Sequence, residues 1–149
     1  MNKEADTPAE LRARALRLLA RREHSRAELS RKLAPRAESP EALQALLDSL
    51  EQKKQLSDER FAAERAHVLS RKFGAVRIRQ DLKAKGIDPE LVSRVSAEGE
   101  LDLARAILER KYREPAETRG ERAKRMRFLQ SRGFSSEIIF KLLSARGED

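Results

Sequence analysis

The sequence of 149 residues contains no cysteine. This absence excludes disulfide bonds, thiolate metal sites and cysteine nucleophiles together, and it fits a protein that works in a reducing compartment. Aromatic residues are also scarce, since there are five Phe, one Tyr and no Trp. That composition is thin for one large hydrophobic core, and it argues against a platform on which many unpaired bases stack.

Long hydrophobic runs are missing as well. No apolar stretch reaches the length of a membrane span or of a signal-peptide core. Together with the missing cysteines, this predicts a soluble protein of the cytoplasm. The chain holds too much Leu, Ile and Val for a disordered tail, so we expect folded domains.

Motifs for catalysis or cofactor binding are absent from the sequence. The six glycines are scattered, and none lies in a GxxxxGK[ST] or GxGxxG arrangement. The two histidines, His24 and His67, lie far apart without a spaced carboxylate partner, and we interpret each as a surface residue. Acidic pairs such as Asp58-Glu59 fall at predicted helix N-termini, where they favour the helix dipole. We therefore predict no enzyme activity, no metal site and no cofactor.

What the chain has in abundance is helix-forming residues, namely Ala, Leu, Glu, Lys, Arg and Gln. Helix starts are marked by a capping residue before proline or by Ser or Thr three residues before Glu. These signals occur at Thr7, Ser25, Ser39, Asp88 and Thr118, and further helix starts are expected at Ser57 and at Ser135 or Ser136. Between them, apolar residues recur at helical spacing, and no stretch alternates with period two for long. The sequence predicts an all-α protein.

The predicted helices recur in threes, each group having a long helix, a short basic helix and a capped third helix. In order they cover 9–22, 25–34, 40–54, 58–73, 75–85, 89–97, 100–113, 120–132 and 136–145. A period of this kind signals a repeat architecture whose neighbouring units support each other. We predict three tandem three-helix units, at 8–56, 57–98 and 99–147, forming an elongated monomer, curved or straight.

Two of the predicted units share a local pattern. The segment "LKAKGIDPELV" at 82–92 aligns without a gap with "LQSRGFSSEII" at 129–139. Gly86 and Gly133 suit left-handed caps at the ends of the short helices, with the next apolar residue packing back onto the helix.

Positive charge is concentrated in the second half of the chain. The whole sequence has a net charge of +8, and residues 70–149 hold 19 basic against 13 acidic residues, which is +6. Such a charge suits an anionic polymer or surface as partner, and it equally suits a well-solvated helical protein. Composition alone does not choose between the two.

The short helices carry much of this charge. In the helix predicted at 75–85, Arg79 and Lys83 share a stripe beside the apolar one, and Arg77 lies next to it. Lys85 falls in the last turn, where a cation stabilises the helix C-terminus. The equivalent segment 119–132 holds six basic residues against one acidic. Two matching basic helices predict a repeated contact surface.

A short helix, a turn and another helix could form a helix-turn-helix that reads the major groove of DNA. The helices that follow the two glycine turns begin with Glu90-Leu91-Val92 and Glu137-Ile138-Ile139. Acidic and apolar residues there are poor at reading base edges, and the basic residues lie on the preceding helix. Sequence-specific recognition of DNA is therefore disfavoured, whereas phosphate contact is not.

Three segments in order resemble the successive signatures of the RecX family of bacterial recombinase regulators, over about residues 10–145. They are "ALRLLARREHSRAELSRKL" at 15–33, "KFGAVRIRQDLKAKGI" at 72–87 and "FLQSRGFSSEII" at 128–139. The matching positions are Phe73, Gly74, Arg77, Ile78, Leu82, Lys85, Gly86 and Ile87, and then Leu129, Arg132, Gly133 and Phe134. One departure is Ala75, where a proline often follows the glycine.

The resemblance implies a non-enzymatic modulator of the RecA recombinase, built of tandem three-helix units and active in recombination, DNA repair and the SOS response. Such proteins bind in the groove of the RecA–DNA filament and limit its growth, strand exchange and ATP turnover. On this reading the partner-binding residues, toward RecA or DNA, are Arg71, Arg77, Arg79, Lys83, Lys85, Arg122, Lys124, Arg127 and Arg132. The alternative is a general nucleic-acid-binding helical repeat protein, held by phosphate contacts to single- or double-stranded DNA.

Overall fold

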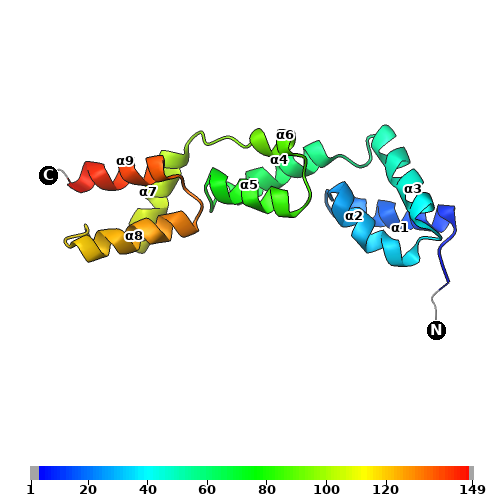
Figure 1. Cartoon of the computed structure of the whole chain (residues 1–149), viewed down its shortest axis with the longest axis horizontal. Helices are drawn as coiled ribbons and strands as arrows, with labels where there is room; N and C mark the ends of the chain where they lie inside the picture. Colours follow the sequence, from blue (N-terminus) through cyan, green and yellow to red (C-terminus); the bar gives the residue numbers. More distant parts are fainter. Residues whose placement is uncertain (1–3, 148–149) are drawn as a thin grey trace. The chain divides into compact units, whose positions relative to one another are not determined.

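The structure, a computed structural model, describes the backbone of residues 4–147 and the side chains of residues 4–144. Over that range it contains nine α-helices, one short 3-10 helix and no β-strand (Figure 1). The prediction of an all-α protein is confirmed. The α-helices are α1 (Pro8–Arg21), α2 (Arg26–Leu33), α3 (Pro40–Gln52), α4 (Asp58–Leu69), α5 (Ala75–Ala84), α6 (Pro89–Ser93), α7 (Glu100–Lys111), α8 (Arg119–Ser131) and α9 (Ser136–Gly147). The 3-10 helix η1 (Ala34–Arg36) follows α2.

Helix starts fall where the capping signals predicted them. Thr7 forms a complete capping box, because its Oγ1 accepts from the Glu10 amide at 3.2 Å and Glu10 accepts from the Thr7 amide at 2.9 Å. The boxes predicted at Ser25 and Thr118 are only half formed. Each hydroxyl accepts an amide N–H, but the Glu28 carboxylate binds Arg22 and the Glu121 carboxylate binds the Glu117 amide. One hydroxyl acceptor is enough to begin those helices.

Two helices end four residues earlier than predicted. The helix α4 ends at Leu69 instead of at residue 73. The amides of Lys72 and Phe73 both donate to the carbonyl of Leu69, and this shared acceptor belongs to a turn. The helix predicted at 89–97 is α6, which ends at Ser93. There the carbonyl of Val95 accepts a hydrogen bond from Arg79, which replaces the helical partner that a longer α6 would supply.

The described residues divide into two compact units. The first contains residues 4–64 together with 83–91, and the second contains 65–82 together with 92–147. The helices α4, α5 and α6 therefore contribute residues to both units, whereas α1 to α3 belong to the first and α7 to α9 to the second.

In the first unit, α1, α2 and α3 lie side by side (Figure 1), and leucines from the three helices form the core between them. Its fully buried members include Leu29, Leu33, Leu47 and Leu50. The segment before α1 is fixed by Asp6, whose amide donates to the Arg36 carbonyl and whose carboxylate pairs with Arg14 at 2.8 Å. These contacts close the N-terminal side of the first three-helix bundle.

In the second unit, α7 packs against both α8 and α9. The core of this three-helix bundle consists of Ala104, Leu108, Leu129, Phe134, Ile139 and Leu142. Phe134 follows Gly133, whose φ of +87° is left-handed, and its ring is 3% exposed, as the sequence predicted. No helix among the described residues is both long and apolar enough to span a lipid bilayer.

Candidate functional site

In the second unit, the start of α5 is joined directly to the turn after α8. The amide of Gly74 donates to the carbonyl of Arg132 at 2.8 Å, and the amide of Val76 donates to the carbonyl of Gly133 at 3.1 Å. The two backbones approach so closely that a Cβ on Gly74 would lie 2.5 Å from the Gly133 oxygen. The glycines of two signatures therefore meet in one joint, which we call the Gly74–Gly133 joint.

Arg77 stabilises this joint. Its side chain is exposed, yet the guanidinium lies 3.9 Å from the centre of the Phe73 ring and donates to the Ser131 carbonyl at 2.8 Å. Arg132 works from the other side, where it is half-buried and donates to the Lys72 carbonyl at 3.2 Å. Both arginines were predicted as partner contacts, and both have structural partners inside the protein.

Arg79 also has an internal partner. It is half-buried, and its Nη2 donates to the carbonyl of Val95 at 2.8 Å. Lys83, one helical turn further along α5, is exposed, as is Arg71 in the turn after α4. Of the residues predicted on and before α5, Arg71 and Lys83 are the ones that present their charge outward.

Lys85 lies at a second joint, in the first compact unit. Its carbonyl accepts a hydrogen bond from Ser25 Oγ at 3.5 Å, and the side chain is half-buried. The next residue, Gly86, has φ +79°, and a Cβ there would lie 3.2 Å from Ala27 Cβ. The left-handed cap predicted at Gly86 is confirmed, and it seats the turn after α5 against the start of α2.

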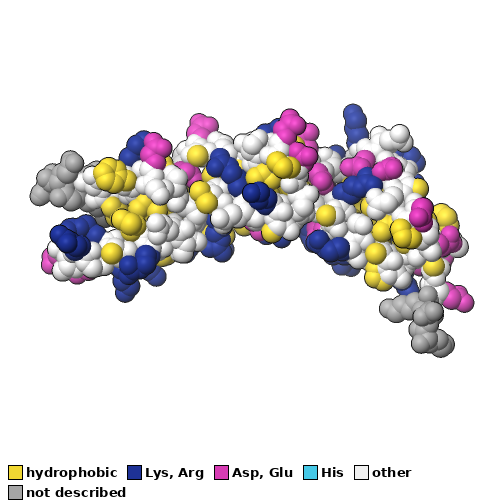
Figure 2. Space-filling view, in the orientation of Figure 1, with side chains coloured by type: hydrophobic (Ala, Val, Ile, Leu, Met, Phe, Trp, Pro, Cys, Tyr) yellow, Lys and Arg dark blue, Asp and Glu magenta, His cyan; other side chains and the backbone are white. Residues whose placement is uncertain are grey.

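The basic face of α8 is the clearest exposed cationic surface of the second unit. Arg122, Lys124 and Arg127 are all exposed, and Figure 2 shows Lys and Arg side chains gathered over this helix. Arg125 is different, because it is 6% exposed, lies 4.5 Å from the centre of the Tyr112 ring and donates to the Glu114 carbonyl. We call Arg122, Lys124 and Arg127 together the α8 basic face. The three spread around the helix, and Lys124 lines a hollow with Glu117 and Glu121.

A cluster of cations and half-buried rings in the second unit was not anticipated from the sequence. Tyr112 and Phe128 meet edge to face with their centres 6.0 Å apart, and Lys111 Nζ lies 4.9 Å from the Phe128 ring. Arg132 lies 5.3 Å from the same ring. Such contacts contribute about 0.5–1 kcal/mol each at exposed sites. The signal in the sequence was an aromatic residue directly after a basic one, at "KY" (111–112) and "RF" (127–128).

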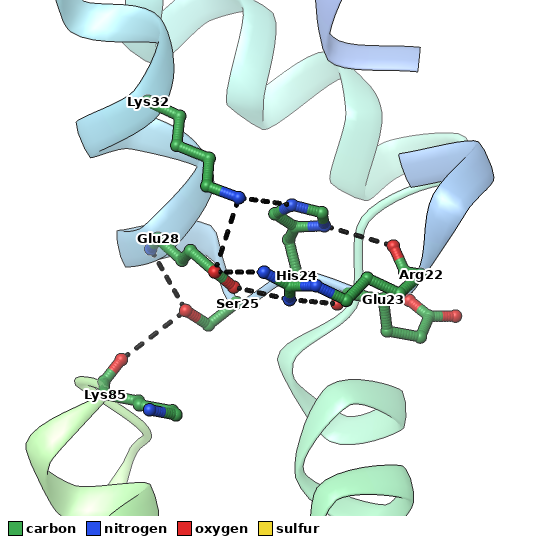
Figure 3. Close-up of polar contacts among 7 residues, drawn as sticks. All are labelled: Arg22, Glu23, His24, Ser25, Glu28, Lys32 and Lys85. Carbon is green, nitrogen blue, oxygen red and sulfur yellow. Dashed lines mark hydrogen bonds and ion pairs between the residues drawn. The ribbon is translucent and has the colours of Figure 1, made fainter. Parts of the chain in front are cut away.

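His24 is buried in the first unit, which corrects its interpretation as a surface residue. It is 1% exposed, in the turn between α1 and α2 (Figure 3). Nδ1 contacts the Arg22 carbonyl and Nε2 contacts Lys32 Nζ, both at 3.1 Å. These contacts fit a neutral ring that donates from Nδ1 and accepts at Nε2. Burial lowers the pKa of His24 below its ordinary value.

Glu28 completes the same polar cluster (Figure 3). Its carboxylate accepts from both terminal nitrogens of Arg22, at 3.0 and 2.6 Å, and lies 3.6 Å from Lys32 Nζ. The hydrogen bonds from Arg22 lower the pKa of Glu28 to about 2. The cluster fixes the turn between α1 and α2. Within residues 4–144, no three His, Cys, Asp or Glu side chains are grouped as metal ligands.

Comparison with known proteins agrees with the tandem arrangement. Three RecX family models match consecutive segments, the first three-helix domain at 12–50, the second at 57–95 and the third at 98–143. A "Regulatory protein RecX" from Ralstonia nicotianae is 42% identical over 139 residues, which is 91% of this chain and 87% of that protein. Another, from Herbaspirillum seropedicae, is 44% identical over 135 residues, covering 89% and 88%.

Solved structures show the same fold. The crystal structure of RecX from Lactobacillus salivarius superimposes with a TM-score of 0.84 at 17% identity, covering 95% of this chain and 97% of that one. A second crystal structure, of regulatory protein RecX, superimposes with a TM-score of 0.75 at 22% identity and covers 93% of this chain and 73% of that one. The molecule is thus an all-α protein of tandem three-helix domains, of the kind found in regulatory proteins. The chain belongs to the RecX family.

Proposed function

We propose that this protein is a negative regulator of the RecA recombinase, which binds the RecA–DNA filament and limits its growth, strand exchange and ATP hydrolysis. The observation that carries the proposal is the α8 basic face, three exposed cations on a chain that belongs to a family of regulatory proteins. In this proposal the protein acts by binding, without catalysis or a cofactor, as a monomer in the cytoplasm.

Hydrogen bonds inside the protein reduce the number of residues that we propose as contacts to the partner. Arg77, Arg79 and Arg132 donate to backbone carbonyls within the protein, so reversing their charge would disturb structure as well as binding. The side chains of the α8 basic face make no such bond to a backbone carbonyl among the contacts described. Reversing their charge should therefore alter binding without disturbing the fold. Arg71 and Lys83 supplement it as exposed cations.

The test reverses the α8 basic face, with Arg122→Glu, Lys124→Glu and Arg127→Glu in one chain. The matched control reverses three exposed arginines of the first domain, Arg17, Arg21 and Arg31, and so changes the net charge equally. The α8 variant should need about tenfold more protein to inhibit the recombinase ATPase, which corresponds to about 1.4 kcal/mol of binding free energy. The control should inhibit nearly as well as the parent, and equal inhibition by all three proteins would refute the proposed surface.

The alternative function is general binding of nucleic acid through phosphate contacts. The same basic face supports it, so binding must be compared on bare single-stranded DNA and on recombinase-coated DNA over a salt series. Binding to phosphates alone weakens steeply with salt and gains nothing from the recombinase. Tighter binding to the coated DNA at the higher salt concentration would favour the filament regulator.

A further inference from the structure

An apolar groove lies between α8 and α9. Met126 on α8 and Phe140 on α9 line it, with Ile139 below, and its volume is about 620 Å³. Phe140 is 70% exposed and Met126 is 42% exposed, although both are large hydrophobic side chains. Figure 2 shows hydrophobic side chains gathered between these two helices.

This exposure is unusual for the chain. Among the described residues, the large hydrophobic side chains that are exposed are Val68, Val76, Met126 and Phe140, and two of the four line the same groove. Single exposed apolar residues need no explanation, but a ring and a thioether on the two sides of a groove resemble the anchor pocket of a protein interface. The flexible Met side chain adapts to the shape of an inserted residue.

The charges on the two edges of the groove differ. On the α9 edge, Glu137 and Lys141 pair with each other at 3.3 Å and so are nearly neutral together. On α8, the exposed Arg122 and Arg127 flank Met126 and Gln130 at helical spacing, whereas Lys124 lies on another side of the helix, where it lines a separate hollow with Glu121. An occupant that complements this groove has an apolar residue at its centre and acidic residues on the side that faces α8.

We propose that this groove binds an acidic protein segment of a recombinase subunit, which inserts an apolar side chain between Met126 and Phe140. The inference rests on the proposed function and names the part of the partner that the third domain contacts. A nucleic acid fits the groove less well, because one exposed ring beside a Met is not a row of aromatic residues on which successive bases stack. The cations then contact carboxylates, and the groove contacts the apolar anchor.

The experiment compares Phe140→Ser and Met126→Ser with Val68→Ser, a matched control in which an exposed apolar residue outside the groove is changed. Affinity is measured for the recombinase filament on single-stranded DNA and for the same bare fluorescein-labelled oligonucleotide. Phe140→Ser should weaken filament binding tenfold or more and Met126→Ser less, whereas Val68→Ser stays within twofold. Binding to bare DNA should not change, and thermal melting should match the parent.

A second arm identifies the molecule in the groove. Benzoylphenylalanine in place of Phe140 keeps an aromatic ring and forms a covalent cross-link on illumination. The cross-link should attach to a recombinase peptide of net negative charge. Attachment to DNA, or an equal loss of bare-DNA binding in Phe140→Ser, would overturn the inference in favour of a nucleic-acid contact. Unchanged filament binding by Phe140→Ser would overturn it alone, whereas a parent protein that does not bind the filament would refute the proposed function itself.

Discussion

Gly133 faces Arg77 so closely that a Cβ built on the glycine would lie 2.2 Å from the Cβ of the arginine. Since Gly133 also has φ +87°, both its backbone and its surroundings require glycine. The contact joins the turn after α8 to the start of α5 within the second compact unit.

We expect Gly133→Ala to lower the free energy of unfolding by about 2–4 kcal/mol, the sum of backbone strain and overpacking. Urea denaturation of the full chain measures the effect. Gly99→Ala is the matched control, because Gly99 has φ +78° but no atom within 4 Å of its added Cβ. That change should cost only about 1 kcal/mol. Equal losses for the two variants would show that the close contact contributes nothing.

Arg77→Lys separates the structural role of this residue from its charge. Lysine keeps the positive charge but lacks the planar guanidinium that stacks on Phe73 and donates to the Ser131 carbonyl. We expect a loss of about 1–2 kcal/mol in stability, with little change in filament binding. Lys83→Arg, on the exposed part of the same helix, should change neither. Weaker binding to the filament at unchanged stability would instead show that Arg77 contacts the partner.

Ile78→Asp and Leu82→Asp should act through folding. The two side chains are 3% and 0% exposed, and an unpaired carboxylate in such a place costs several kcal/mol. Circular dichroism and thermal melting should show reduced helicity and a lower melting temperature. Gln80→Asp, an exposed position on α5, is the control. Lost function at unchanged stability in either core variant would contradict this assignment.

Acid should weaken the first domain through His24 and Glu28. The folded-state pKa of each lies below its ordinary value, so the unfolded chain binds more protons, and stability falls as pH falls. The His24 contribution is lost as pH drops below about 6.5, and the Glu28 contribution is lost between about 4.5 and 2. After solvent screening we expect about 1–2 kcal/mol from Glu28.

Glu28→Gln tests this pH dependence, since it keeps the size of the side chain and removes the charge. Its unfolding free energy, measured by urea denaturation from pH 7 to pH 3, should lie below that of the parent at neutral pH. The two curves should converge toward acid. Parallel curves would mean that the pairing of Glu28 with Arg22 does not contribute to stability.

Local signals in the sequence predicted much of the fold. The caps at Thr7 and Ser39 and the left-handed turns at Gly86 and Gly133 depend on a few adjacent residues, and all four occur where expected. The contact just beyond the end of α6 was not predictable from adjacent residues, because the donor Arg79 lies sixteen residues before its acceptor Val95.

The candidate site was predicted less well, for a physical reason. Helical periodicity places a basic residue beside an apolar stripe, but it does not show whether a carbonyl from a distant segment lies within reach. Arg77 and Arg132 reach such carbonyls, whereas Arg122 and Lys124 are exposed on α8. Burial of His24 was missed likewise, because its partner Lys32 comes from the following helix.

The two joints, each within one compact unit, follow one rule. In each compact unit, a glycine turn at the end of one short helix contacts the start of the short helix before it: Gly86 meets Ala27, and Gly133 meets Arg77. The first domain has Ala34-Pro35-Arg36 in place of such a turn, so it offers no glycine turn to a preceding domain. The start of α8, at Thr118, is the surface that the rule leaves for a following one. Growth by duplication, natural or engineered, should therefore succeed by adding a domain after the third, and a fourth domain should carry its own glycine turn.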